Sequence, residues 1–456
     1  HLLLAQNKNF KFGQLSIDDG LSNTNVICIF QDSRGFLWFG TRDGLNKYDG
    51  YSFTVYSHDA KDSTTLGSNL ITGIVEDENH YLWITTEGGG LNRYDRFTDR
   101  FQRFQHNNSD PESIASDIAV SLAQDSQGNL WIGTESSGLD FFDKKTQKFT
   151  HYSHDPADRL TLSDKNVEAV YVDKDDNVWV GTNKGGLNLL NRKKSTFTRF
   201  TNDPADPASP LASNYVRAIY QDKKGRLWIG TGGGGLHLYD YESGSVSKVQ
   251  TQERIGNEMI HALGEDDEGN IWIGHENGSL VIYNPALGTY VDYAKSEGEF
   301  GLKSNSIWSF LMDAKGTMWI GTFNGGVNFV DKDVNKFGHY QHNQSTNSLS
   351  NNMVLCFLEE DKGNVWIGTD GGGLNLFNEA DKSFVHYEHV EGDPNTICGN
   401  YVLTVIKDDE DNLWIGTWGN GLTVFNRKKN TFRHYENDPA DPVSYTHLTL
   451  PTNREV

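Results

Sequence analysis

Charged and aromatic side chains stand at two fixed distances from a tryptophan that recurs along the chain. Eleven residues before it, four consecutive repeats carry Glu168, Arg217, His261 and Trp308. Four residues after it, several repeats carry Arg42, Glu87, Glu135, Glu276 and Phe323. An aromatic face can stack on a sugar ring while charged groups bond its hydroxyl groups. We therefore expect these residues to line a surface that binds an oligosaccharide or another small molecule.

The same residues allow a purely structural interpretation. Glu168 and Arg217 could form an ion pair between neighbouring repeats, and Trp308 could fill the core. Pairs of this kind serve packing and need not touch a ligand. The two interpretations differ in one outcome. Replacing Arg217 and Trp308 by Ala in a folded protein should weaken ligand binding only if these side chains contact the ligand.

Enzyme motifs are missing from the sequence. It contains no Gly-x-Ser-x-Gly, His-Glu-x-x-His, P-loop or Cys-x-x-Cys pattern. A propeller lyase or glycosidase would need paired carboxylates, or His and Tyr, at one channel mouth. Only Glu168 and His261 hint at such a pair. We therefore predict that this segment has no catalytic residue and binds no cofactor.

Glycine strings and aspartate-rich loops have simpler explanations than ligand binding. Strings such as Gly88 to Gly90 recur at one turn and open strands instead of helices, so they indicate turn geometry and not a phosphate loop. Loops such as His154-Asp155-Pro156 could hold Ca²⁺, but Asp-Pro more often initiates a turn. The three cysteines, Cys28, Cys356 and Cys398, form no metal-like pairs. We predict no metal site.

The repeat that carries these residues has one core motif, seen at Gly35-Phe36-Leu37-Trp38-Phe39-Gly40-Thr41. Its tryptophan stands at positions 38, 83, 131, 179, 228, 272, 319, 366 and 414, with spacings between 44 and 49 residues. Self-similarity at a fixed period indicates a repeat architecture. Two repeats depart from the motif, with Thr85 in place of Gly and His275 in place of Thr.

Each repeat predicts four short antiparallel strands. In the fifth repeat, residues 216–222, 227–231 and 236–240 are β-rich and separated by glycine turns, and the fourth strand is clearer at residues 197–200 of the preceding repeat. A single sheet with two apolar faces cannot bury both faces by itself. Identical sheets that pack radially around one axis bury both faces of each sheet. A buried Trp removes roughly 150–250 Å² from water and wedges between sheets. The predicted fold class is all-β, a β-propeller.

The repeats predict more than one ring, because nine blades exceed the common range of about four to eight. Lys11-Phe12-Gly13 leads into the first repeat as Lys336-Phe337-Gly338 leads into the eighth. The Phe12 segment predicts a fourth strand that completes the seventh blade and closes a ring over residues 10–335. The Phe337 strand would open a second ring, with about two blades over residues 336–442. Alternatively, Phe337 finishes the seventh blade.

Both ends of the chain differ from the repeats. Residues 1–9 begin His1-Leu2-Leu3-Leu4-Ala5-Gln6, which has the pattern of a signal-peptide remnant and lead-in, or else is an arbitrary apolar start. The first interpretation predicts an extracytoplasmic, periplasmic location. Residues 443–456, from Val443-Ser444-Tyr445, resemble a translated sequencing adapter. We interpret this tail as an artefact and expect the natural protein to continue.

Composition excludes several partners. The net charge of −22 opposes binding to nucleic acid or to anionic lipid. No run of about 18 apolar residues is present, so we expect membrane attachment only through a missing downstream segment. Aromatic residues make up 12% of the chain, and 47 glycines stand against 10 prolines, a balance typical of all-β proteins with tight turns.

The repeat resembles that of the two-component regulator propeller family. The resemblance covers residues 10–442 and rests on Asp19-Gly20-Leu21-Ser22-Asn23, Gln31 to Thr41, and Asp43-Gly44-Leu45-Asn46-Lys47-Tyr48-Asp49-Gly50. It implies paired seven-bladed rings in the periplasmic sensor of a hybrid two-component system. Such rings precede a β-sandwich, a membrane helix and a histidine kinase, or in related proteins a diguanylate cyclase. It further implies oligosaccharide detection and a homodimer in the full-length protein.

We therefore predict a ligand-sensing propeller that relays its state to a histidine kinase. Two alternatives remain open at this stage. The propeller could be a protein-interaction or dimerisation scaffold with no small ligand, or the sensor of a diguanylate cyclase. Calorimetry against an oligosaccharide panel distinguishes the scaffold from the ligand sensor.

Overall fold

The computed structural model describes residues 10–206, 209–249, 258–296, 298, 300–331, 340–342, 347–360 and 363–436. Within these ranges the secondary structure consists of β-strands and one 3-10 helix, η1 (Ile17–Asp19). The strands form antiparallel sheets of four, which confirms the predicted all-β class. The chain divides into two compact units, His1–Lys336 and Phe337–Val456. The proposed signal-peptide remnant (residues 1–9), the Phe337 strand and the tail (residues 443–456) lie outside the described residues.

The sheets of the first unit share one order of strands. The innermost strands are β2 (Val26–Gln31), β6 (Ile71–Glu76), β10 (Ala119–Gln124), β14 (Val167–Val172), β18 (Val216–Gln221), β22 (Ile260–Glu265) and β26 (Ile307–Met312). The second strands, which carry the tryptophan, are β3 (Leu37–Thr41), β7 (Leu82–Thr86), β11 (Leu130–Thr134), β15 (Val178–Thr182), β19 (Leu227–Thr231), β23 (Ile271–His275) and β27 (Met318–Thr322).

The outer half of each sheet completes the blade. The third strands are β4 (Gly44–Tyr48), β8 (Gly90–Asp95), β12 (Gly138–Asp143), β16 (Leu187–Asn191), β20 (Gly235–Asp240), β24 (Leu280–Asn284) and β28 (Val327–Val330). The outermost strands are β5 (Phe53–Tyr56), β9 (Arg100–Phe104), β13 (Lys148–Tyr152), β17 (Thr196–Phe200), β21 (Ser245–Lys248), β25 (Thr289–Tyr293) and, for the seventh blade, β1 (Gly13–Leu15).

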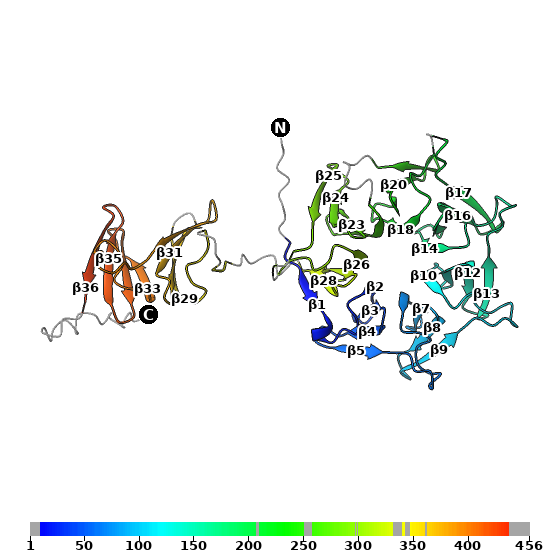
Figure 1. Cartoon of the computed structure of the whole chain (residues 1–456), viewed down its shortest axis with the longest axis horizontal. Helices are drawn as coiled ribbons and strands as arrows, with labels where there is room; N and C mark the ends of the chain where they lie inside the picture. The colour runs from blue at the N-terminus through cyan, green and yellow to red at the C-terminus, as the bar shows by residue number, and fades with distance from the viewer. Residues whose placement is uncertain are drawn as a thin grey trace. The chain divides into compact units, whose positions relative to one another are not determined.

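The start of the first unit completes its seventh sheet. β1 pairs antiparallel with β28, with Leu15 opposite Val327. Phe12, just before β1, is buried in an apolar cluster with Trp272 and Ile307. Each innermost strand contacts those of the two neighbouring sheets, and β26 contacts β2. The first unit is therefore a closed ring of seven blades, as predicted (Figure 1).

The second unit holds two further blades. One consists of β29 (Val354–Glu359), β30 (Val365–Thr369), β31 (Leu374–Asn378) and β32 (Ser383–Tyr387), and the other of β33 (Val402–Lys407), β34 (Asn412–Thr417), β35 (Gly421–Asn426) and β36 (Thr431–Tyr435). β29 contacts β33, so the two sheets pack as neighbours. Phe357 on β29 is exposed, whereas Ile74, its equivalent in the second repeat, is buried in a cluster with Trp38 and Leu45 of the preceding blade. The second unit therefore leaves apolar strand surface uncovered.

The repeated tryptophan is the wedge between blades. Trp38 is buried and lies in one cluster with Ile71 and Ile84 of the next blade. Its indole Nε1 donates to the buried carboxylate of Asp32, six residues earlier, at 2.7 Å. Seven other repeats have the same Trp–Asp bond at 2.8–3.4 Å: those of Trp83, Trp131, Trp179, Trp228, Trp272, Trp319 and Trp414. The indole is thereby fixed to the turn between the first two strands.

This aspartate also links neighbouring blades. Asp32 Oδ1 accepts the backbone N–H groups of Arg34 and Phe36, which closes the turn. Its other oxygen lies 3.3 Å from the guanidinium of Arg96, which belongs to the next blade. A buried carboxylate needs such partners because burial of an unpaired charge is costly. The turns between first and second strands therefore hold the blades in a fixed relative orientation at the end of the sheets opposite the predicted site.

Candidate ligand-binding site

The predicted site residues occupy one irregular position in the innermost strands. In the sixth blade Ile260 pairs with His275 and Ala262 pairs with Gly274, so His261 between them is the extra residue of a β-bulge. Glu168, Arg217 and Trp308 are the bulge residues of the fourth, fifth and seventh blades. A bulge bends its strand and re-aims the side chain of the extra residue. The fold thus repeats one side-chain position at the mouth of the ring, and the sequence fills it differently in each blade.

Three aromatic rings from the sixth and seventh blades form a stack at this mouth. The His261 and Trp308 rings have centroids 5.5 Å apart and planes 8° apart. The Trp308 and Phe323 rings follow at 5.2 Å and 24°. Arg42, from the first blade, places its guanidinium 5.7 Å from the Trp308 ring and 5.5 Å from the Phe323 ring. The stack therefore spans three adjacent blades, and its aromatic faces already attract one cation.

Trp308 is only partly buried, in contrast to the repeated tryptophans of the first ring. Its Nε1 is buried and finds no hydrogen-bond acceptor among the described residues. An unpaired buried N–H lowers stability, and such groups are uncommon outside functional positions. Trp366, a tryptophan of the repeated core motif, shares this feature.

His261 is held neutral beside a carboxylate. Its Nε2 lies 3.0 Å from Glu276 Oε2, and the imidazole side chain is 5% exposed. Burial, and then the nearby positive charge of Arg217, lowers the pKa of His261 below its ordinary value. Because a carboxylate only accepts, the neutral ring carries its proton on Nε2. The carboxylate of Glu276 remains partly exposed and can still accept hydrogen bonds from a ligand.

An ion pair joins the fourth and fifth blades. Glu168 Oε2 lies 3.0 Å from the Arg217 guanidinium, as the structural interpretation of these residues expected. Asn183 Nδ2 donates to Glu168 Oε1 at 2.8 Å, and Arg217 donates to the Tyr215 hydroxyl at 2.7 Å. Gly232 leaves the space that Tyr215 occupies, since a Cβ there would lie 2.4 Å from the Tyr215 ring. The pair is partly exposed, so it can be both a blade contact and a ligand contact.

The structure brings seven of the predicted residues together and leaves two apart. We call the following set the mouth arc: Glu168, Arg217, His261, Glu276, Trp308, Phe323 and Arg42. Within the mouth arc, the Glu168–Arg217 ion pair and the aromatic stack are electrostatically connected, because, in addition to burial, the charge of Arg217 lowers the pKa of His261. Glu87 and Glu135 are exposed on the second and third blades, and their carboxylates have no side-chain partner among the described residues.

Sequence reasoning missed two members of the site. Tyr215 and Asn183 complete the hydrogen bonds of the Glu168–Arg217 pair. Asn183 stands four residues after its tryptophan, at the same distance as Glu276 and Phe323, so that distance was the available signal. Tyr215 gave none, because its role depends on the missing side chain at Gly232.

The described residues contain no group of three or more His, Cys, Asp or Glu side chains placed to hold a metal ion. Nor do those residues include a helix with the length and apolar character needed to cross a bilayer.

Comparison with known proteins identifies the repeat. A family model described as a two component regulator propeller matches nine segments, each spanning the innermost strand, the tryptophan strand and the start of the next turn: residues 20–43, 65–88, 113–136, 161–184, 210–233, 254–277, 301–324, 348–371 and 396–419. The chain belongs to the two-component regulator propeller family. Each matched segment of this regulator propeller contains the position eleven residues before the tryptophan and the position four residues after it, which supply the residues of the mouth arc.

Relatives of this regulator propeller belong to signalling proteins. Its fold is similar to the extracellular domain of a putative hybrid two component system from B. thetaiotaomicron, with a TM-score of 0.71 and 28% identity, over 94% of this chain and 55% of that one. The extracellular domain of a putative one component system from the same organism shares the fold, with a TM-score of 0.57 and 20% identity, over 93% of this chain and 67% of that one.

A histidine kinase of Formosa agariphila, named Histidine kinase P4, is 53% identical over 64 residues, which are 14% of this chain and 5% of the kinase. The chain thus spans about half the length of the first structure that it resembles and a small part of this kinase. What this chain shares with the two extracellular domains is the propeller fold.

Proposed function

We propose that the first ring is the ligand-binding part of a periplasmic two-component receptor, and that the mouth arc binds an oligosaccharide released from a glycan. The observation that carries this proposal is the stack of His261, Trp308 and Phe323, of which Trp308 and Phe323 are partly exposed, beside the Glu168–Arg217 ion pair and the Glu276 carboxylate. Aromatic faces supply the apolar contact that a sugar ring needs, and the charged groups supply directional hydrogen bonds to its hydroxyls.

The geometry of the arc suits relay as well as binding. Its residues come from the fourth to seventh blades and from the first, so one ligand could contact several blades at once. Ligand contacts that differ between two arrangements of the blades would shift the balance between them. Such a shift is the input that a histidine kinase downstream in the full-length protein would receive. Support comes from the similar extracellular domains and from the kinase relative.

Calorimetry of the chain against a panel of neutral and acidic oligosaccharides tests the proposal. We expect one class to bind with a negative heat-capacity change, because aromatic surface becomes buried. A panel without any binding would contradict ligand sensing. Crystals grown with the best binder should show density over the Trp308 face, and density elsewhere would contradict the assignment of the site.

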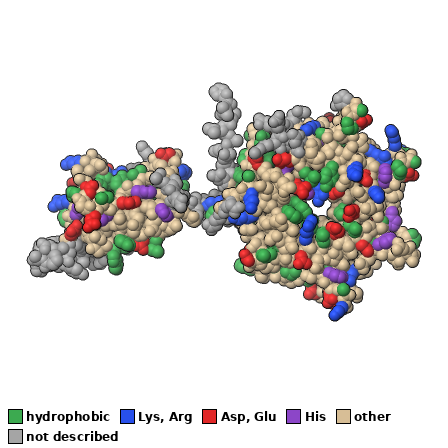
Figure 2. Space-filling view, viewed as in Figure 1, with side chains coloured by type: hydrophobic (Ala, Val, Ile, Leu, Met, Phe, Trp, Pro, Cys, Tyr) green, Lys and Arg blue, Asp and Glu red, His purple; other side chains and the backbone are tan. Residues whose placement is uncertain are grey.

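A second candidate, a protein-interaction scaffold, is favoured by a different observation. The second unit exposes Met353, Phe357 and Trp418, which are 58%, 67% and 71% accessible. Hydrophobic side chains gather on its visible face in Figure 2. Large exposed apolar patches mark interaction surfaces. If light scattering shows a dimer that Phe357→Glu dissociates, and no oligosaccharide binds, the scaffold is the better description. An output through a diguanylate cyclase remains a further alternative, which the kinase relative does not favour.

A further inference from the structure

In two blades, the loop that precedes the innermost strand encloses an arginine from the outermost strand. In the second blade, Arg103 donates to the carbonyls of Asp59 (3.2 Å), Asp62 (2.7 Å) and Thr65 (2.8 Å), and to Thr65 Oγ1 (2.8 Å). These acceptors lie within one turn of seven residues, so they match the fork of a guanidinium group. The loop therefore forms a receptor for its own arginine.

The fourth blade repeats this arrangement. Arg199 donates to the carbonyls of Asp158 (3.0 Å), Thr161 (2.7 Å) and Leu162 (3.1 Å). Both arginines occupy the same register, opposite Asn92 on β8 and opposite Asn188 on β16. Backbone carbonyls, and not carboxylates, bind the guanidinium in each case. The site is thus a property of the loop conformation.

The described residues of the equivalent loop in the fifth blade make the same hydrogen bond, but this blade lacks the arginine. Asp203 N donates to Ser209 Oγ at 2.8 Å, as Asp59 N donates to Thr65 Oγ1 at 2.9 Å in the second blade. Lys248 holds the register of the arginines, opposite His237 on β20. Its side chain is exposed, and none of the described residues accepts a hydrogen bond from its ammonium group.

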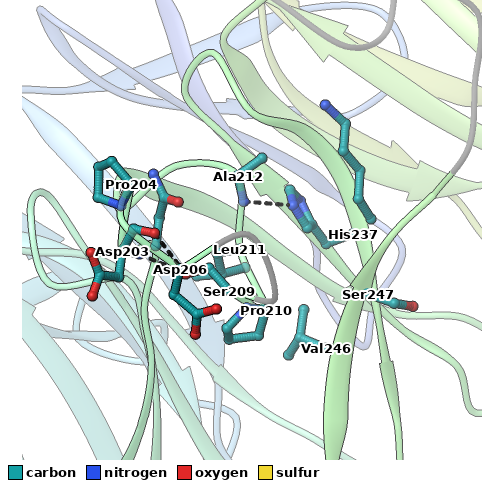
Figure 3. Close-up of a pocket in the computed structure, with 12 residues that line it drawn as sticks. Asp203, Pro204, Asp206, Ser209, Pro210, Leu211, Ala212, His237, Val246 and Ser247 are labelled. Carbon is teal, nitrogen blue, oxygen red and sulfur yellow. Dashed lines mark hydrogen bonds between the residues drawn. The ribbon is translucent and has the colours of Figure 1, made fainter.

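A pocket of about 560 Å³ remains in the fifth blade, and we call it the rim pocket. Asp203, Asp206, Ser209 and Pro210 line one side, and His237 and Val246 line the other (Figure 3). Val246 and Leu211 offer apolar contact for a methylene chain. Lys248 also lines the pocket. His237 adds no charge near neutral pH, because burial lowers its pKa to about 4, and its Nε2 accepts the Ala212 N–H at 3.0 Å.

We propose that the rim pocket binds an alkylguanidinium group of a second molecule, in the place that Arg103 and Arg199 hold in their own blades. A guanidinium fits better than an ammonium, since Lys248 stands in register and lines the pocket, yet its ammonium donates a hydrogen bond to none of the described residues. The group could come from a small arginine derivative or from an arginine in a peptide. The site is separate from the mouth arc and does not depend on it.

Thermal unfolding in the presence of L-arginine methyl ester tests the proposal, because a ligand of the folded state raises the midpoint with concentration. L-citrulline methyl ester, whose ureido side chain is neutral and of similar shape, is the control ligand. We expect only the arginine ester to raise the midpoint of the wild type. A tetrapeptide with one central arginine shows whether a peptide binds more tightly than the free derivative. Absence of a response to both arginine ligands would overturn the proposal.

Three variants make the test specific. Lys248→Arg should fill the rim pocket from within, raise the ligand-free midpoint, and weaken the response roughly tenfold or more. Lys248→Gln should respond at least as strongly as the wild type, because it leaves the pocket open and removes a positive charge from its wall. Arg199→Lys should open an equivalent pocket in the fourth blade, with a lower ligand-free midpoint and a larger response. Equal responses in the wild type and Lys248→Arg would overturn the proposal. If Lys248→Arg does not fold, the Arg199→Lys variant decides. A rise in its midpoint with L-arginine methyl ester that is no larger than that of the wild type would then overturn the proposal.

Discussion

His261 and Trp308 are the bulge residues of two adjacent blades, and their rings stack 5.5 Å apart with planes 8° apart. Neither residue belongs to the repeated core motif. The common motif holds the ring together, whereas the positions that vary from blade to blade meet at its mouth. This separation is the basis for placing ligand binding in the mouth arc.

The Trp–Asp bond should carry a large part of each blade's stability. Asp77 is buried and accepts the Trp83 N–H at 2.9 Å and the backbone N–H groups of Asn79 and Tyr81. Asp77→Ala leaves these donors unpaired in a buried site, and we expect a loss of about 2–4 kcal/mol in the free energy of unfolding. Urea denaturation measures it. The neighbouring Glu78→Ala removes a largely exposed carboxylate and its ion pair with Lys144, and should cost less than about 1 kcal/mol. Equal effects would contradict this role.

The packing between blades allows a second prediction. Gly40 faces Cys28 across the strand pair, and a Cβ on it would lie 2.4 Å from Cys28 Sγ and 2.7 Å from Ile71 Cγ2. Gly40→Thr should therefore destabilise the ring by about 1–3 kcal/mol through overpacking. Adding Cys28→Gly should recover part of the loss, and a double-mutant cycle in urea measures the coupling. Strictly additive effects would contradict the close contact.

His151 should make stability depend on pH in one direction. Its Nδ1 lies 2.6 Å from Asp140 Oδ1, and this bond raises the pKa of His151 against the opposing effect of burial. The folded state then holds the proton more tightly than the unfolded state. The stabilisation is fully present below the unfolded pKa of about 6.5 and is lost as pH rises through the folded pKa. Urea midpoints of the wild type, measured below and above this pH range, should show the loss of stability, and those of His151→Gln should not. If His151→Gln keeps the pH profile of the wild type, His151 is not the cause.

His237 should act in the opposite direction. Burial lowers its pKa to about 4, so the folded state resists protonation. The stabilisation is present above the unfolded pKa and is lost as pH falls toward about 4, by roughly 3 kcal/mol. His237→Asn introduces the residue that the fourth blade has at the equivalent position, Asn188. The side-chain oxygen of Asn188 accepts the Ser163 N–H, as His237 Nε2 accepts the Ala212 N–H. We expect this variant to retain more stability at acid pH than the wild type, as followed by circular dichroism in urea. Equal acid sensitivity would exclude His237 as the cause.

The repeat made most of the fold predictable. The spacing of the tryptophans and the glycine turns indicated four strands per blade, and Phe12 indicated the strand that completes the seventh sheet. The cross-strand contacts were not predictable in the same way. Thr85 replaces the usual glycine, and Gly73 stands directly opposite it on the neighbouring strand. The two departures compensate for each other, but only the register shows that they meet.

The site was predictable in its residues but not in its geometry. Counting from the tryptophan located the positions of Glu168, Arg217 and Trp308. It could not show that each is the extra residue of a β-bulge, because a bulge appears only in the pairing of two strands. The same counting included Glu87 and Glu135, which lie on blades whose bulge residues, Thr72 and Val120, carry no charge or ring.

The most direct test of the mouth arc is calorimetry of Trp308→Ala with the tightest oligosaccharide of the panel, alongside Glu135→Ala as a control outside the arc. Both variants should unfold cooperatively, which shows that the ring is intact. We predict that Trp308→Ala weakens binding about tenfold or more, because stacking on one aromatic face is worth more than about 1 kcal/mol, and that Glu135→Ala leaves affinity unchanged. Unchanged affinity in a folded Trp308→Ala protein would contradict ligand binding at the mouth arc.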